Sequence, residues 1–305
     1  MKRAIITGAT GAIGTALVVE LINAGIEVLV LCRKGSDRNT RIPIHPLVEK
    51  RYCGLEELAT LENDTGKTYD VFYHLAWAGT TGQARNNMYL QNMNVRYTLD
   101  AVGAANRFGC TTFIGAGSQA EYGRVEGVLK PDTPTFPEMG YGYGKLCAGL
   151  MTRDYAKQLG MKHIWCRILS IYGPNDGMQS LVMSVIDAIN KGNVPKCTKG
   201  EQKWDYLYSV DAAKAFLLMA EKGVDGRTYV LGSGKVRPLA QYIQDICDEA
   251  STGSTADFGA IPYSAKQVMY LCADITSLQE DTGFIPEYSF AEGIRETIRW
   301  FRENN

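Results

Sequence analysis

Two residues spaced four apart have the chemistry of an acid–base pair. The segment Tyr141-Gly142-Tyr143-Gly144-Lys145 contains Tyr-x-x-x-Lys, and residues four apart share one face of a helix. A phenol with a pKa of about 10 is a poor acid–base group at neutral pH, but a nearby ammonium lowers that pKa. The spacing therefore predicts Tyr141 as a catalytic acid–base and Lys145 as its partner, although the same spacing is common in any helix.

Ser118 is a third candidate catalytic residue. It follows an apolar run that is predicted to be a strand over 111–115. Ligands bind at the carboxyl ends of the strands in open α/β sheets, so the hydroxyl is placed to orient a substrate carbonyl. The alternative is a serine that only caps a turn or a helix.

The N-terminal loop Gly8-Ala9-Thr10-Gly11-Ala12-Ile13-Gly14 has the composition of a phosphate cradle. It separates a predicted strand over 4–7 from a predicted helix over 12–24. Glycine permits a sharp turn and a close approach to pyrophosphate, and the helix N-terminus offers free N–H groups. The alternative is a loop that needs glycine only for positive φ. The predicted cofactor contacts are Gly8, Thr10, Gly11, Ala12, Ile13 and Gly14.

The end of the second predicted strand indicates which dinucleotide binds. An acidic residue there accepts hydrogen bonds from the ribose of NAD, whereas an arginine suits the 2′-phosphate of NADP. This chain has Cys32 at the acid position, followed by Arg33-Lys34-Gly35-Ser36. Arg33 and Ser36 predict NADP over NAD, with NADPH as the hydride donor. The alternative is a solvated basic turn.

These residues need a sheet to position them. Apolar runs predict strands over 4–7, 27–31, 70–76, 111–115 and 162–169, and periodic patterns predict helices over 12–24, 86–108 and 141–159. Continuous apolar strands separated by helices predict a parallel sheet covered on both faces. We therefore expect an α/β Rossmann domain over 1–172, with about 205–232 returning to it. Residues 173–305 form a smaller, discontinuous substrate domain that ends in an amphipathic helix.

Composition narrows the classes of partner. The 305 residues carry a net charge of -1, so no global field favours nucleic acid or an anionic membrane. Eight dispersed cysteines without a C-x-x-C pair suggest reduced, buried thiols, and three histidines at unsuitable spacing predict no metal site. Neither a signal-peptide pattern nor a 20-residue apolar run is present, which predicts a cytoplasmic protein.

In order and spacing, the motifs resemble those of the extended short-chain dehydrogenase/reductases, the epimerase/dehydratase family. The resemblance rests on Thr7-Gly8-x-x-Gly11-x-x-Gly14, His74-Leu75-Ala76, Asn94-Val95, Gly117-Ser118-Gln119-Ala120-Glu121-Tyr122-Gly123, Tyr141-x-x-x-Lys145, Tyr172-Gly173-Pro174 and Trp204-Asp205-Tyr206-Leu207-Tyr208. It covers nearly the whole chain.

What the resemblance implies is a set of roles. It implies Ser118, Tyr141 and Lys145 as catalytic residues and a nucleotide-diphosphate sugar as substrate. It further implies Leu75, Ala76 and Asn94 around the cofactor, and Trp77, Gln119 and Ser170 around the substrate. A tryptophan such as Trp77 can equally well pack in the core. The family also implies a homodimer that pairs the helices over 86–108 and 141–159.

The residues after Ser118 separate the reactions of this family. Its dehydratases carry Asp-Glu there, but this chain has Gln119-Ala120, which cannot perform that acid–base work. Glu121 lies one position beyond and is not taken as equivalent. The pattern resembles reductases of nucleotide-activated 4-keto-6-deoxy sugars, the group that includes CDP-abequose synthase. The alternatives are a nucleotide-sugar 4-epimerase and a non-catalytic NADP(H)-binding sensor.

Several positions depart from the family pattern. Cys53-Gly54-Leu55 replaces the usual acid after the third strand, Ser170 replaces an asparagine, and Trp204 replaces an arginine. Arg167 and Arg237 are candidate phosphate partners, each with ordinary ion pairing as the alternative.

Overall fold

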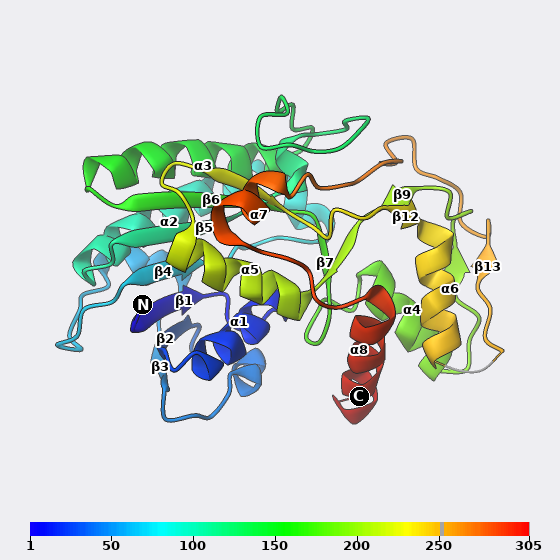
Figure 1. The fold of residues 1–305 in the computed structure, drawn as a ribbon, viewed down its shortest axis with the longest axis horizontal. Coiled ribbons are helices and arrows are strands. Elements are labelled where there is room, and N and C mark those ends of the chain that lie inside the picture. The colour runs from blue at the N-terminus through cyan, green and yellow to red at the C-terminus, as the bar shows by residue number, and fades with distance from the viewer. Residues whose placement is uncertain (251–252, 305) are drawn as a thin grey trace.

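A seven-stranded parallel sheet forms the centre of the molecule in the computed structural model, which describes residues 1–250 and 253–304. The strand order is β11-β6-β5-β4-β1-β2-β3. The strands are β1 (Arg3–Thr7), β2 (Glu27–Cys32), β3 (Val48–Tyr52), β4 (Val71–His74), β5 (Thr112–Ser118), β6 (Lys162–Ile168) and β11 (Thr228–Leu231). The predicted α/β Rossmann architecture is confirmed (Figure 1).

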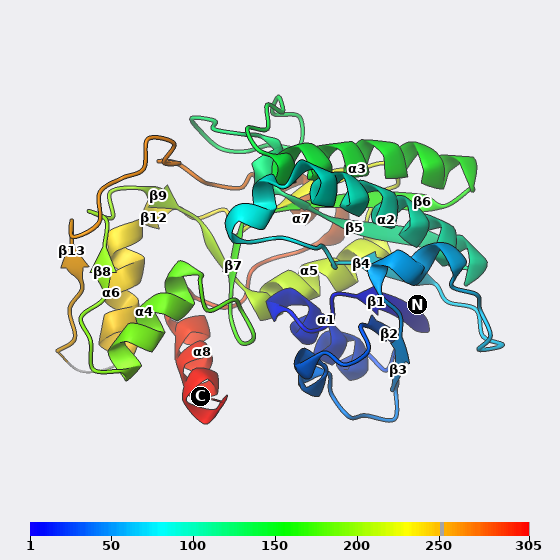
Figure 2. The same cartoon turned by 180° about the vertical axis from the view of Figure 1, so that it is seen from behind.

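Helices cover both faces of this sheet. α1 (Ala12–Asn23) and α5 (Ser209–Lys222) lie on one face, and α2 (Met88–Arg107) and α3 (Gly140–Gln158) lie on the other (Figures 1 and 2). Successive strand residues point to opposite faces. Accordingly, Ile6 packs with Leu17 and Phe216 under α1 and α5, whereas Ile5 packs with Val102 under α2.

The strand order reverses between β1 and β4. The chain proceeds from β1 to β2 and β3 in one direction, then returns to build β4, β5 and β6 in the other. At such a switch point the loops after the two central strands diverge and leave a crevice for ligands. The loops that follow Thr7 and His74 therefore flank one site, and these two residues are register partners.

A smaller lobe follows β6. Its helices α4 (Leu181–Asn190), α6 (Leu239–Ala250) and α8 (Phe290–Asn304) share a core that includes Ile186, Ile243 and Ile298. Three two-stranded pairs surround them. These are β7 (Ser170–Tyr172) with β10 (Tyr206–Tyr208), β9 (Lys203–Trp204) with β12 (Arg237–Pro238), and β8 (Lys196–Cys197) with β13 (Asp257–Phe258).

The chain crosses between the lobes more than once. After β10, α5 packs on α1 and β11 pairs with β6, while α7 (Thr276–Thr282) contacts α5. The sequence predicts that the chain returns to the Rossmann domain near 205–232, and α5 and β11 lie in that segment. The domain boundaries themselves stay a prediction. Short 3-10 turns complete the elements: η1 (Asp37–Arg41), η2 (Leu55–Thr60), η3 (Gly82–Asn86) and η4 (Gln119–Glu121).

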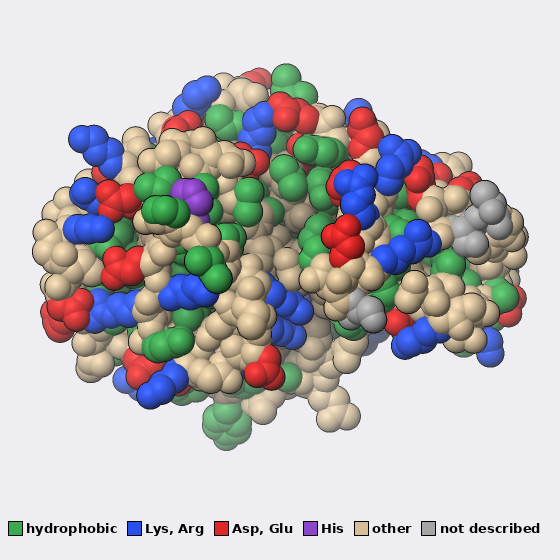
Figure 3. Space-filling view, turned by 90° about the horizontal axis from the view of Figure 1, so that it is seen from below, with side chains coloured by type: hydrophobic (Ala, Val, Ile, Leu, Met, Phe, Trp, Pro, Cys, Tyr) green, Lys and Arg blue, Asp and Glu red, His purple; other side chains and the backbone are tan. Residues whose placement is uncertain are grey.

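Surface features agree with the modest net charge. On the face in Figure 3, Lys and Arg side chains are interspersed with Asp and Glu side chains rather than forming one broad basic area. Among the described residues, no helix has both the length and the apolar character to cross a bilayer.

Candidate active site

The glycine loop lies against the loop that follows β4. Gly8 has φ +77°, and a Cβ there would stand 2.6 Å from the Ala76 nitrogen. A Cβ on Gly14 would stand 2.1 Å from the Gly8 oxygen. These two glycines therefore let the turn form and let α1 approach β1 closely.

Gly11, unlike Gly8 and Gly14, has no backbone atom of the described chain pressed close to it. It is the N-cap of α1 and gives no side-chain cap, so the first N–H groups of the helix are available to a ligand. The nearest neighbour of a Cβ on Gly11 would be the Gly8 oxygen at 3.9 Å. The loop thus presents a helix N-terminus with open space beside it, as a dinucleotide pyrophosphate requires.

Arg41 anchors this loop, and sequence reasoning missed it. Its guanidinium donates to the carbonyl oxygens of Thr10 at 3.1 Å and Asn175 at 3.4 Å. Burial, followed by the nearby Arg38, lowers the pKa of Arg41. The arginine joins the glycine loop to the loop after β7, and no local motif signals a contact across 134 residues.

The candidate 2′-phosphate residues lie beyond β2. Cys32 ends that strand and is buried, whereas Arg33 and Lys34 are exposed and Ser36 is half-buried. Asn39 donates to the Arg33 carbonyl and holds the turn. Among the described residues, the Arg33 guanidinium has no acidic partner, so it is available to an anion.

Ser118 and Tyr141 meet at the carboxyl end of β5. Ser118 is the last residue of that strand, and its hydroxyl accepts from the Ala120 N–H at 3.1 Å. The phenol of Tyr141, in the first turn of α3, lies close enough to Ser118 for this hydroxyl to lower its pKa. Ser118 thus caps η4, which is the role considered from the sequence as the alternative to catalysis. It also lies beside Tyr141, the candidate acid–base.

Lys145 is buried one helical turn beyond Tyr141. Its ammonium donates to the Ala116 carbonyl at 2.6 Å and lies 3.8 Å from the centre of the Trp77 ring. Burial lowers the pKa of Lys145 to about 7. The negative charge of the Glu121 carboxylate acts in the opposite direction and raises this pKa, but its effect is the smaller of the two. The cation is therefore held in a low-dielectric position close to the phenol ring.

The pKa of Tyr141 differs from the sequence expectation. It is raised, not lowered, because burial outweighs the Ser118 hydrogen bond and the nearby Arg85 guanidinium. Arg85 lies 4.4 Å from the centre of the Tyr141 ring, whereas the Lys145 ammonium is 5.8 Å away and bonds a carbonyl. Arg85, on η3, was not identified from the sequence.

Trp77 and Asn94 brace the chain after β4. Trp77 is half-buried, donates to Gln91 at 2.8 Å and meets the Tyr141 ring edge-on at 6.1 Å. Asn94 is buried and bonds both the N–H and the carbonyl of Ala78. Leu75, Ala76, Trp77 and Asn94 are thus brought to the same side of the crevice as Gly8 and Tyr141.

Ser170 and Trp204, both departures from the family pattern, contact each other. The Trp204 indole donates to the Ser170 hydroxyl at 2.8 Å. Ser170 follows Ile168, the register partner of Ser118, so both lie at the carboxyl edge of the sheet with half-buried Gln119. The candidate phosphate partners are engaged elsewhere: Arg237 pairs with Asp245, and buried Arg167 pairs with Glu121.

The assembled groups can bind and orient a carbonyl substrate beside a dinucleotide. Ser118 and Tyr141 place hydroxyl groups beside each other, Lys145 lies one helical turn from Tyr141, and the chain after β4 contacts both the glycine loop and Tyr141. Tyr141 with a raised pKa is protonated at neutral pH and is therefore able to donate a proton.

Comparison with known proteins agrees with this geometry. The family model of the NAD dependent epimerase/dehydratase family matches residues 4–232. CDP-abequose synthase of Salmonella typhimurium is 23% identical over 310 residues, covering 97% of each chain.

Solved structures show the same fold. UDP-N-acetylglucosamine 4-epimerase from Methanobrevibacter ruminantium M1, in complex with UDP-N-acetylmuramic acid, aligns with a TM-score of 0.89 and 23% identity, covering 100% of this chain and 99% of that one. The UDP-glucose 4-epimerase of Thermus thermophilus, in complex with NAD, has a TM-score of 0.86 and 21% identity, covering 99% and 100%. The chain therefore belongs to the NAD dependent epimerase/dehydratase family of nucleotide-sugar enzymes.

Proposed function

We propose that this protein reduces the C4 carbonyl of a nucleotide-activated 4-keto-6-deoxy sugar, with NADPH as reductant. The observation that carries the proposal is the Ser118–Tyr141 pair, in which the phenol stands beside a hydroxyl at the carboxyl end of β5. A reduction needs an acid at this position, because the carbonyl oxygen gains a proton as it becomes a hydroxyl.

The residues have separate roles in the proposed mechanism. Ser118 orients the carbonyl oxygen, and Tyr141 donates its proton to the forming alkoxide. Lys145 stabilises the phenolate that remains, because a cation near a phenolate favours the charged form. The glycine loop, Leu75, Ala76 and Asn94 would hold the dinucleotide, which supplies the hydride when bound.

Dehydration is disfavoured at this site. Gln119 and Ala120 follow Ser118, and neither an amide nor a methyl group can move protons on sugar carbons. Glu121, the first carboxylate after them, is fully buried and paired with Arg167 rather than directed at a substrate.

A 4-epimerase is the second candidate, supported by the fold of the epimerases above. An epimerase begins by oxidising a hydroxyl and so needs Tyr141 as a base. The same phenol returns the proton in the second half of that reaction, so Tyr141 would serve either function. NAD in place of NADP would accompany this reaction, because the same cofactor molecule is then oxidised and reduced in turn.

A substrate screen tests the proposal. CDP-, dTDP- and GDP-linked 4-keto-6-deoxy sugars would be supplied with NADPH, with absorbance and product NMR as readouts. The expected result is stoichiometric NADPH oxidation and a new C4 hydroxyl with one of them. Interconversion of 4-hydroxy sugars without NADPH consumption would establish the epimerase, and binding of NADP(H) without turnover would favour the sensor.

Arg33 is expected to set the cofactor preference. Its free guanidinium suits the 2′-phosphate, and a charge-assisted hydrogen bond contributes about 1.5–3 kcal/mol. We expect Arg33→Ala to raise the KM for NADPH by about tenfold or more while leaving that for NADH little changed. Arg299→Ala, an exposed arginine on α8, is the control. A wild-type preference for NADH would overturn the assignment.

The outer face of α2 and α3 is the proposed homodimer surface. Tyr89 on α2 and Met151 on α3 are exposed by 89% and 47%, and exposed apolar surface of this kind can mark an interface. Light scattering should give the mass of two chains, and Met151→Glu should give that of one. A monomeric wild type would contradict the proposal. A cytoplasmic location likewise stays a prediction.

A further inference from the structure

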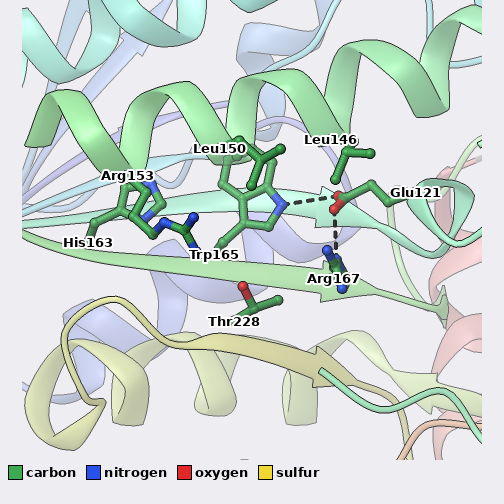
Figure 4. Close-up of a pocket in the computed structure, with 9 residues that line it drawn as sticks. Glu121, Leu146, Leu150, Arg153, His163, Trp165, Arg167 and Thr228 are labelled. Atoms are coloured by element: carbon green, nitrogen blue, oxygen red, sulfur yellow. Dashed lines mark hydrogen bonds and ion pairs between the residues drawn. The ribbon is translucent and has the colours of Figure 1, made fainter. Parts of the chain in front are cut away.

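Glu121 is buried below the candidate site, and both of its carboxylate oxygens accept hydrogen bonds from protein groups. One carboxylate oxygen accepts from the Ser118 backbone N–H at 2.8 Å and from the Trp165 indole at 3.0 Å. The other accepts from Arg167 at 2.7 Å (Figure 4). Glu121 has no solvent exposure, so this network is satisfied entirely by protein groups.

Three glycines make room for this network. A Cβ on Gly115 or Gly149 would stand 2.3 Å or 2.7 Å from the Trp165 ring, and one on Gly117 would stand 2.4 Å from the indole nitrogen and 2.6 Å from the Glu121 carboxylate. The indole therefore lies flat between β5 and α3, with its N–H directed at Glu121. Its position is fixed by backbone on both sides.

Arg167 is fixed from its other side as well. Its guanidinium donates to the Pro131 carbonyl at 3.0 Å and lies 4.6 Å from the centre of the Tyr122 ring. The cavity beside these residues has a volume of about 20 Å³, which is room for about one water molecule. No ligand fits there, so the ion pair serves the protein itself.

We infer that Glu121 is a positioning residue that holds Ser118 in the orientation needed to meet Tyr141. Glu121 bonds the Ser118 backbone N–H, while the Ser118 hydroxyl caps Ala120 and lies beside the Tyr141 phenol. The backbone N–H and the hydroxyl of Ser118 are therefore both held by hydrogen bonds within the turn η4. The inference rests on the proposed function for its kinetic consequence, but not for its geometry.

A stabilising role alone is a weaker explanation of this pair. Burying two charges costs desolvation that their attraction only partly offsets, and apolar replacements are often as stable. The geometry of the ion pair suggests a different role. The two oxygens of a fixed carboxylate can accept from three donors at once, and so connect Ser118 to Trp165 and Arg167. A glutamine cannot do so, since either orientation turns its NH2 group toward a donor N–H.

The variant Glu121→Gln therefore tests the inference. We expect its kcat to fall by about tenfold to hundredfold, because a small misplacement of a reacting group is costly. The KM for the sugar and the affinity for NADPH should stay within about twofold of the wild-type values. The double variant E121Q/R167M removes the opposing donor and should recover most of the lost kcat. Failure of that rescue would indicate that charge, not position, is what matters.

A second measurement needs no turnover. In protein labelled with 13C at the tyrosine ζ carbon, the Tyr141 resonance is the one absent from Tyr141→Phe. Ser118→Ala should move it in the wild-type background, because the hydrogen bond is lost. In the E121Q background, where Ser118 is already displaced, Ser118→Ala should move the Tyr141 resonance little. In the E121Q/R167M background, where Ser118 is restored to its position, Ser118→Ala should move the resonance as it does in the wild type.

The control is an exposed ion pair on the same loop. Glu138 pairs with Arg124 at 2.9 Å close to Tyr141, and Glu138→Gln should leave the Ser118→Ala shift intact. Equal shifts in the wild-type and E121Q backgrounds would overturn the inference. An inactive wild type with unequal shifts would overturn only the proposed reduction.

Discussion

The variant Tyr141→Phe is expected to lose activity by about 10²–10⁴-fold in kcat while keeping its fold and its affinity for NADPH. The size follows from the usual contribution of a positioned general acid. Phenylalanine keeps the ring that packs edge-on against Trp77 and under Arg85. It removes only the hydroxyl that lies beside Ser118 and that we propose as the proton donor.

Tyr143→Phe is the matched control, because this tyrosine lies two residues along the same helix and exposes 48% of its side chain. Its kcat should stay within about twofold of wild type, as surface changes rarely perturb a site. Both variants would be assayed for NADPH oxidation and titrated with NADPH by fluorescence. Near-normal turnover by Tyr141→Phe would remove this residue from the mechanism.

Much of the fold is predictable because it depends on local patterns. The helix predicted over 141–159 spans Gly140–Gln158, and the strand predicted over 27–31 spans Glu27–Cys32. The helix ends just before a glycine, and the strand is an apolar run that ends before two charged residues. The strand after Thr111 is longer than predicted and carries Ser118 as its last residue, because Ala116 and Gly117 continue the pairing with β6.

The sequence identifies candidate catalytic residues by type, but it does not indicate their electrostatics. Spacing alone indicates that Lys145 shares a helix face with Tyr141, yet not that the ammonium bonds Ala116. Arg41 and Arg85 reach the site from turns whose sequences carry no motif. The pKa of Tyr141 depends on burial, a property of the folded chain that no local pattern encodes.

Glu121 shows how a local signal can be present and still be misjudged. Ser118-Gln119-Ala120-Glu121 fits the S-x-x-E capping box, and the structure has both of its hydrogen bonds. The partners Trp165 and Arg167 lie on β6, more than 40 residues away, and decide what the carboxylate does. A cap is thus one interpretation that the sequence allows for Ser118, whereas the surroundings of Glu121 depend on a register between two strands.

The variant Lys145→Met is expected to be nearly inactive and yet more heat-stable. Loss of the ammonium removes the group proposed to stabilise the Tyr141 phenolate, which should lower kcat by about 10²-fold or more. Methionine keeps much of the buried volume against Trp77. It also removes a cation whose burial is unfavourable, as the pKa of about 7 indicates.

The gain in stability should depend on pH in one direction. Well below pH 7 the wild-type lysine is protonated in both the folded and the unfolded chain, so the full burial penalty applies. Between its folded pKa of about 7 and its ordinary value of 10.5, the unfolded chain binds more protons. The wild-type free energy of unfolding therefore rises with pH in this window, and the advantage of Lys145→Met shrinks.

Thermal unfolding of the cofactor-free proteins from about pH 6 to about pH 9.5 would measure this dependence, since most of the window lies within that range. Lys157→Met, on the exposed last turn of the same helix, should show neither the lost activity nor the pH-dependent gap. A gap between wild type and Lys145→Met that stays constant across the window would mean that Lys145 titrates near its ordinary pKa. The low-dielectric environment assigned to it would then be wrong. A shrinking gap with lost turnover would instead show that the chain accepts a destabilising cation because the site requires it.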